Sequence, residues 1–158
     1  RENPAEANTE DNVDTVQEKE IIQTPPTGGM KLHFEPVTRD SVKAIEFKNS
    51  ALELLINNGN LIDAKAMGDL AILNNPDDAD SWYIRGNINQ KLVRDNDALQ
   101  DFLKAVELNS EHIDAIKKSA ILFNKTGDKG MSCYYLLKAC NLGDPEACDG
   151  LRKFCNQQ

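Results

Sequence analysis

The sequence predicts an all-α protein, an α-solenoid of three helix pairs with a C-terminal capping helix, preceded by a disordered N-terminal tail. Three observations support this prediction. Apolar residues recur at helical spacing from Ser41 onward. Small residues return every 34 residues along the same stretch. The first 40 residues instead combine prolines, glycines and acidic side chains with few large apolar ones.

The composition narrows the function before any motif is considered. The 158 residues include 26 acidic and 18 basic ones and carry a formal net charge of −8, so the chain offers no basic field to nucleic acid or anionic lipid. No apolar run reaches the roughly 18 residues of a membrane span. With two histidines, His33 and His112, both expected in exposed loops, and no phosphate-binding glycine motif, we expect a non-enzymatic protein without cofactor or metal.

The tail, residues 1–40, holds nine acidic and four basic residues, so most of the net negative charge lies there. Such a polar segment cannot bury enough apolar surface to offset its ordering entropy, and we expect a flexible acidic linker. Within it, residues 14–22 could form a turn of helix, and residues 30–34 alternate like a short strand. The chain begins at Arg1 without a basic-then-apolar leader, which leaves a removed signal or a lipid anchor ahead of residue 1 as a hypothesis.

The body, residues 41–158, begins with two predicted helices. Ser41 is a suitable cap for the first, and Gly59 ends it. The second is expected over Leu61–Leu73, because Asn75 precedes Pro76 and a residue before proline avoids the helical conformation. Two helices in about 34 residues suggest a repeat of that length.

The 34-residue period divides the body into units 45–78, 79–112 and 113–146, followed by a capping helix over residues 146–156. Columns of small residues support the period, because helices approach closely only where no bulky side chain intervenes. The columns are Ala71, Ala105 and Ala139; Ala64, Ala98 and Ser132; Leu52, Gly86 and Ala120; and, in the inter-helix turn, Gly59, Val93 and Gly127.

These columns resemble the tetratricopeptide repeat (TPR) over residues 45–146. The signature residues are Trp82, Gly86, Ala98, Phe102 and Ala105 in the middle unit and Ala64, Ala71 and Pro76 in the first. The sequence departs from the family pattern at Arg85, Asn89, Gly68 and Ser110, where Leu, Tyr, an aromatic residue and proline are usual. The resemblance implies stacked helix pairs in which Trp82, Phe102 and Phe123 are packing residues.

All four cysteines lie in the last 26 residues, at Cys133, Cys140, Cys148 and Cys155. Cys133 and Cys140 are seven residues apart on one predicted helix, and Cys148 and Cys155 are seven residues apart on the next, so each helix carries its two cysteines on one face. The two helices are antiparallel and are joined at Asp144-Pro145. In such a hairpin, the residue numbers of any two residues that face each other add up to the same value. Cys140 with Cys148 and Cys133 with Cys155 meet this condition, which predicts disulfides between them. Reduced core thiols and a four-thiolate metal site remain alternatives, although metal sites typically use closer spacing.

The segment from Lys138 to Cys148 also resembles the Sel-like repeat, in particular its cysteine-rich, secreted bacterial branch. That resemblance implies a disulfide between Cys140 and Cys148. Because disulfides persist in oxidising compartments, we expect a periplasmic or otherwise extracytoplasmic protein, with a lipoprotein anchor as a further hypothesis.

The TPR resemblance implies a concave surface lined by the first helix of each unit. The residues expected there are rich in amides, which can bind the backbone of an extended peptide. Lysines near the third unit would suit an acidic segment or a C-terminal carboxylate. The expected partner-binding residues are Asn49, Glu53, Asn57, Tyr83, Asn87, Gln90, Lys91, Lys117, Lys118, Ile121, Asn124 and Lys125.

The sequence therefore predicts a non-catalytic adaptor or scaffold that binds a peptide or protein partner in the concave TPR groove, outside the cytoplasm and within an envelope assembly. Two alternatives remain, a cytosolic three-repeat TPR chaperone or co-chaperone and a Sel-like protein that binds a cell-wall ligand or a β-lactam. The chaperone-tail clamp of some TPR proteins needs Lys and Asn in the first helix and Asn in the third. Asn49, Glu53 and Ile84 occupy those places, so that function is not carried over.

Overall fold

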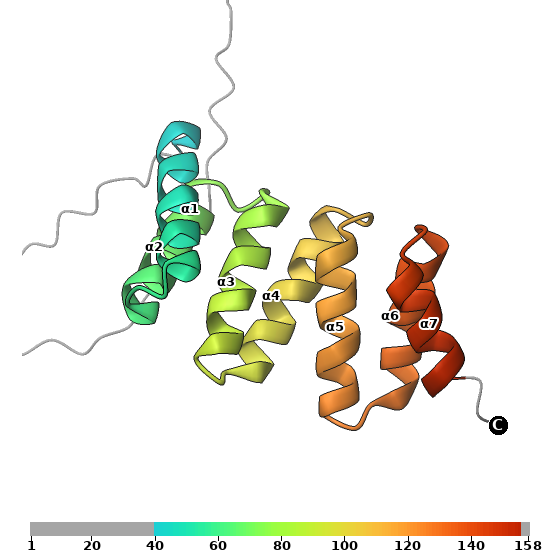
Figure 1. Cartoon of the computed structure of the whole chain (residues 1–158). Coiled ribbons are helices and arrows are strands. Elements are labelled where there is room, and N and C mark those ends of the chain that lie inside the picture. Colours follow the sequence, from blue (N-terminus) through green and yellow to red (C-terminus); the bar gives the residue numbers. More distant parts are fainter. Residues whose placement is uncertain (1–39, 156–158) are drawn as a thin grey trace, which may run out of the picture. The chain divides into compact units, whose positions relative to one another are not determined.

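The computed structural model describes residues 40–155, which form seven helices (Figure 1). No strand occurs within this range. The helices are α1 (Ser41–Ile56), α2 (Leu61–Asn74), α3 (Ala79–Lys91), α4 (Asp95–Leu108), α5 (Ile113–Lys125), α6 (Lys129–Asn141) and α7 (Pro145–Phe154).

Successive helices pack as stacked pairs. α1 packs on α2, α3 on α4 and α5 on α6, while α2–α3 and α4–α5 contacts join each pair to the next (Figure 1). α7 packs on α6 and ends the stack. The predicted all-α architecture of three helix pairs and a C-terminal capping helix is thereby confirmed for the described residues.

The small-residue columns in the second helix of each pair lie in the core, as predicted. They are buried because the neighbouring backbone approaches closely at these positions. The buried residues are Ala64, Ala71, Ala98, Ala105, Ser132 and Ala139. Phe102 is fully buried between its neighbours, which confirms that it is a packing residue.

The N-terminal cap of α1 differs from the prediction. Asp40, not Ser41, is the capping residue, and its carboxylate accepts hydrogen bonds from the backbone N–H groups of Val42 and Lys43 at 3.1 Å each. Asp and Ser are both good caps, so cap propensity does not distinguish Asp40 from its neighbour Ser41. The rest of the tail, including residues 14–22 and 30–34 and His33, lies outside the described residues.

The first helix pair is out of register with the predicted period by one residue. The loop between α1 and α2 has four residues, 57–60, whereas the loops at 92–94 and 126–128 have three. The left-handed backbone position after each first helix is Asn58 (φ 51°), Val93 (φ 60°) and Gly127 (φ 87°). The turn column is therefore Asn58, Val93 and Gly127, and the prediction of Gly59 in this column was wrong.

The same shift corrects the small-residue column of the first helices. Ala51 is fully buried and takes the place assigned to Leu52, which is exposed. Its counterparts Gly86 and Ala120 are buried as predicted. At Gly86 the need for a small residue is explicit, because an added Cβ would lie 2.6 Å from a ring carbon of Phe102.

Three departures from the TPR pattern meet in one polar cluster. Arg85 donates to the buried carboxylate of Asp101 through Nε at 3.1 Å and Nη2 at 2.6 Å, and to Asp69 through Nη1 at 2.8 Å. Asn89 donates to Asp101 at 2.8 Å. Gly68 lies against the Arg85 side chain. A Cβ added to Gly68 would be 3.4 Å from the Cβ of Arg85, so the large aromatic residue usual at position 68 would not fit there. The substitutions compensate one another and link α2, α3 and α4.

Both predicted disulfides are present. Cys133 pairs with Cys155 and Cys140 with Cys148, with Cα–Cα distances of 5.8 and 4.7 Å. They join α6 to α7, the last two helices of the stack. The structure thus favours bridging over the reduced-thiol and metal alternatives.

Candidate peptide-binding surface

The predicted partner-binding residues lie on α1, α3 and α5, or directly after α1. None of them is fully buried. Exposed members are Asn49, Glu53, Asn57, Lys91, Ile121, Asn124 and Lys125, and partly buried members are Tyr83, Asn87, Gln90, Lys117 and Lys118.

Tyr83 is held in place by aromatic neighbours. Its ring lies 4.7 Å from the His112 ring and 5.8 Å from the Phe102 ring, between centroids. His112 is not the exposed loop residue that the sequence suggested. Its side chain is largely buried, and Nδ1 accepts from the backbone N–H of Ala115 at 3.3 Å to cap α5. Tyr83 therefore presents a fixed surface rather than a mobile ring.

The amides on α3 take part in intramolecular hydrogen bonds. Asn87 donates from Nδ2 to the backbone oxygen of Tyr83 at 3.1 Å. The side-chain oxygen of Gln90 accepts from Lys118 Nζ at 3.0 Å, which joins α3 to α5. The Asn87 side-chain oxygen and the Gln90 NH₂ group retain hydrogen-bonding capacity for a peptide backbone.

The predicted basic end of the surface is largely neutralised by nearby acids. Lys117 pairs with Asp144 at 3.1 Å and with Glu146, and hydrogen bonds to these two carboxylates raise the pKa of Lys117 above its usual value. Lys125 pairs with Asp95. Because these contacts offset the lysine charges, the structure weakens the argument for an acidic partner segment.

Lys91 bridges back to the first helix pair. Its Nζ lies 3.2 Å from the backbone oxygen of Leu55 and 3.4 Å from Oδ1 of Asn58. It thereby satisfies a carbonyl oxygen near the C-terminal end of α1, where intrahelical donors run out. This structural role was not apparent from the sequence, because the contact spans more than 30 residues.

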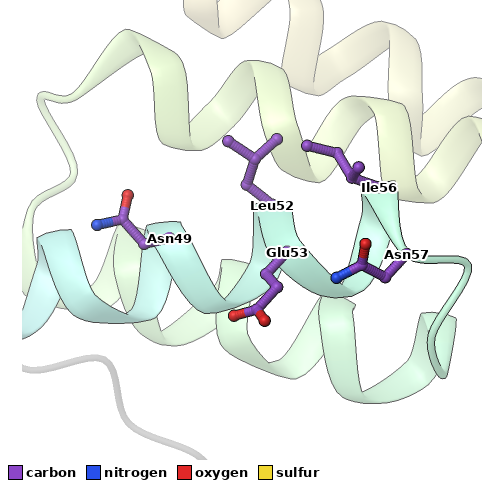
Figure 2. A pocket seen from close by; sticks show the side chains of 5 residues that line it. All are labelled: Asn49, Leu52, Glu53, Ile56 and Asn57. Atoms are coloured by element: carbon purple, nitrogen blue, oxygen red, sulfur yellow. The ribbon is translucent and has the colours of Figure 1, made fainter.

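The first helix supplies a shallow hollow of about 280 Å³. Asn49, Leu52, Glu53, Ile56 and Asn57 line it, all from one side of α1 and the residue after it (Figure 2). Three of these are among the predicted partner-binding residues, and Ile56 was expected on the same concave lining, whereas Leu52 was not. With the corrected register, Leu52 and Ile56 are equivalent to Asn87 and Lys91 on α3. The first unit therefore contributes apolar side chains where a polar surface was expected.

No group of three or more His, Cys, Asp or Glu side chains in residues 40–155 is arranged to hold a metal ion. Among these helices, none is long and apolar enough to cross a membrane.

No family model matches the chain, and no curated protein sequence is significantly similar to it. Solved structures are similar in fold. The first TPR domain of Spaghetti (RPAP3), bound to an HSP90 peptide, has a TM-score of 0.67 and 19% identity, covering 75% of this chain and 94% of that one. The TPR2B domain of yeast Sti1, in its pHsp70 complex, has a TM-score of 0.65 and 21% identity, covering 75% and 100%.

The chain adopts the tetratricopeptide-repeat fold. A third TPR structure is similar, that of the Yersinia enterocolitica type III secretion chaperone SycD with a peptide of the translocator YopD. It has a TM-score of 0.65 and 14% identity, and the match covers 73% of this chain and 94% of that one. At such identities the similarity shows the fold alone. The Sel-like resemblance of the C-terminal segment remains a prediction.

The corrected register also changes the residues at the places of the chaperone-tail clamp. In the first helix, Lys48 and Leu52 replace Asn49 and Glu53 as its equivalents. Lys48 supplies the lysine that the clamp requires, but its Nζ is already paired with the Asp78 carboxylate at 2.9 Å. Leu52 cannot supply the amide, and Ile84 is buried. The clamp residues are therefore incomplete in this chain.

Proposed function

We propose that this TPR protein is a non-catalytic adaptor that binds a peptide or protein partner along α1, α3 and α5. The observation that carries the proposal is the row of partly exposed polar groups on α3, centred on Asn87 and Gln90. These groups are held by hydrogen bonds yet retain unused capacity. Fixed amides of this kind can satisfy the backbone of an extended peptide at little ordering cost.

Three structural neighbours support this proposal by analogy. RPAP3, Sti1 and SycD are each described in complex with a peptide or chaperone ligand, although each shares less than 22% identity with this chain. Their ligands are not transferred to this protein. What the analogy supports is the class of function, binding by stacked helix pairs without catalysis.

We further propose that the protein works outside the cytoplasm, in an envelope assembly. Its two disulfides support this location, because such bonds persist in oxidising compartments and are rare in reducing ones. Both bridges join α6 to α7, the last two helices of the described residues.

Site-specific photocrosslinking tests the proposed surface. A photoreactive residue in place of Asn87 on α3 should capture a partner in extracts of the native source. Asn96, an exposed residue on α4, provides a matched control at which little capture is expected. Equal capture at both sites, or capture at Asn96 alone, would refute binding along α3 and place the partner elsewhere.

A further inference from the structure

One side of α1 carries a row of large apolar side chains that the other described helices leave exposed. Val42, Ile45, Leu52 and Ile56 have exposed fractions of 67%, 54%, 37% and 67%. Asn49, also exposed, completes the row. The five positions are separated alternately by three and four residues, so they form one stripe about 21 Å long. The residues that α1 buries against the domain lie on another side of the helix and are Ala44, Ala51 and Leu55.

Alternating three- and four-residue spacing is the heptad pattern of a helix that pairs with another helix. Val42, Asn49 and Ile56 occupy the first core position of successive heptads, and Ile45 and Leu52 the second. β-Branched residues at the first position with leucine at the second favour a parallel two-stranded pair, a pattern that Val42, Ile56 and Leu52 follow and Ile45 does not, and one asparagine at the first position fixes its register. We propose that α1 pairs in parallel with α1 of a second copy of this chain.

The residues that line the hollow on α1 are those that such pairing requires. In a coiled coil each core side chain enters a hole formed by four residues of the facing helix. Asn49, Leu52, Glu53 and Ile56 line the hollow of about 280 Å³ and surround the level of Leu52 (Figure 2). In a parallel pair in register, Leu52 of the second copy lies at that level and enters the hollow. The two copies are equivalent, so each leucine enters the other's hollow.

The charges beside the row favour the parallel orientation. Glu46 and Glu53 follow one edge of the row, and Lys48 lies on the other. An antiparallel pair would bring glutamate edges of two copies together, whereas a parallel pair places the Lys48 edge of one copy against Glu53 of the other. Lys48 is 21% exposed and pairs with Asp78 at 2.9 Å and Asp80 at 4.0 Å, which offset part of its charge, so the parallel orientation rests mainly on keeping the two glutamate edges apart.

The extent of the row predicts a weak dimer. Two heptads bury less than the roughly 1,200 Å² typical of a stable interface, so association should be reversible and concentration-dependent. Pairing would occupy the apolar end of the proposed partner surface and leave the amides of α3 and the residues of α5 accessible. The inference stands apart from the proposed function, because the dimer can be measured without any partner.

Sedimentation velocity of the 158-residue chain, from micromolar to near-millimolar concentration, tests the pairing. We expect a reversible monomer–dimer equilibrium. Leu52→Lys should weaken it at least about tenfold, because a charge would replace an apolar side chain in the core of the interface. Ile62→Lys is the matched control. Ile62 is exposed on α2 and is not part of the row, so its substitution should leave the equilibrium unchanged. A chain that stays monomeric throughout, or a dimer that survives Leu52→Lys, overturns the proposal.

Cross-linking through single cysteines determines the orientation and keeps the test valid if Leu52→Lys perturbs folding. In a parallel pair Val42 faces its own counterpart, so Val42→Cys should form a covalent dimer under mild oxidation. In an antiparallel pair Val42 lies near Ile56 of the other copy, and only a mixture of Val42→Cys and Ile56→Cys would cross-link. The second result, or no cross-linking by either variant, would refute the parallel pair.

Discussion

The polar cluster around Arg85 should contribute strongly to stability, and its contribution can be measured by a double-mutant cycle. The Asp101 carboxylate accepts three hydrogen bonds, two from Arg85 at 3.1 and 2.6 Å and one from Asn89 at 2.8 Å. The side chain of Asp101 is 4% exposed and that of Arg85 is 20% exposed. Removal of Asp101 therefore leaves a guanidinium in a mostly buried site without its main acceptor.

Loss of one partner of a buried ion pair typically costs about 3–5 kcal/mol. The lower end applies here, because Asp69 retains its contact with Arg85 at 2.8 Å and the guanidinium keeps some access to water. We expect Asp101→Ala to lower the free energy of unfolding by about 3 kcal/mol, a Tm decrease of roughly 10 °C for a domain of this size. Burial disfavours the charged guanidinium, but the contacts with Asp101 and Asp69 outweigh it and raise the pKa of Arg85.

Urea unfolding followed by circular dichroism gives the four corners of the cycle: the unmodified chain, Arg85→Ala, Asp101→Ala and the double variant. Contacting charges in a shared network should show a coupling energy of about 2 kcal/mol. The control is the exposed pair Lys104–Glu107 on α4, for which at most about 0.5 kcal/mol is expected. If coupling between Arg85 and Asp101 is no larger than in the control, the reasoning about this cluster is refuted.

Three further outcomes are expected. Gly86→Ala should destabilise the domain by about 1–2 kcal/mol, because its Cβ would overlap Phe102, whereas Gly68→Ala meets only ordinary contacts and should stabilise it by a few tenths, both measured by urea unfolding. The hydrogen bond from the Ala147 backbone N–H lowers the pKa of Asp144; partial burial opposes this effect and Lys117 adds to it. The ionised Asp144 carboxylate therefore stabilises the fold above about pH 4, and this stabilisation is lost as the pH falls below that value. Asp144→Asn should flatten the decline of Tm below about pH 4, and an unchanged acid limb would contradict that assignment. Mass spectrometry of the chain from its native source should find no free thiol before reduction and four afterwards; four free thiols at the outset would contradict the extracytoplasmic proposal.

Features that repeat along the chain could be predicted from sequence. Ala71, Ala105 and Ala139 occupy the same crossing point in each helix pair, and close approach of backbones imposes a small residue there whatever surrounds it. The cysteine pairing was equally accessible, because two helices joined by a three-residue loop have almost no freedom of register. In both cases a local rule determined the answer.

Contacts between distant residues were not predictable in the same way. The sequence presented Lys117 and Lys125 as free positive charges, and the structure pairs them with Asp144 and Asp95, each about 30 residues away. Nothing in local spacing indicates which acid lies opposite which lysine across a helix crossing. The Asp101 partner of Arg85 was missed for the same reason, although the unusual residue at position 85 marked the site.

The inserted loop residue had the largest consequence for the predicted surface. Gly59 matched the glycine expected after the first helix, so the 34-residue period seemed unbroken, but Asn58 adopts the left-handed conformation instead, as asparagine readily does. An error of one residue turns a helix by about 100°, which exchanges one face for another. The predicted register made Asn49 and Glu53 the equivalents of Tyr83 and Asn87. In the structure, the α1 residues at those places are Lys48 and Leu52. The first unit thus presents an apolar row suited to a second helix, and the amides available to an extended peptide are concentrated on α3.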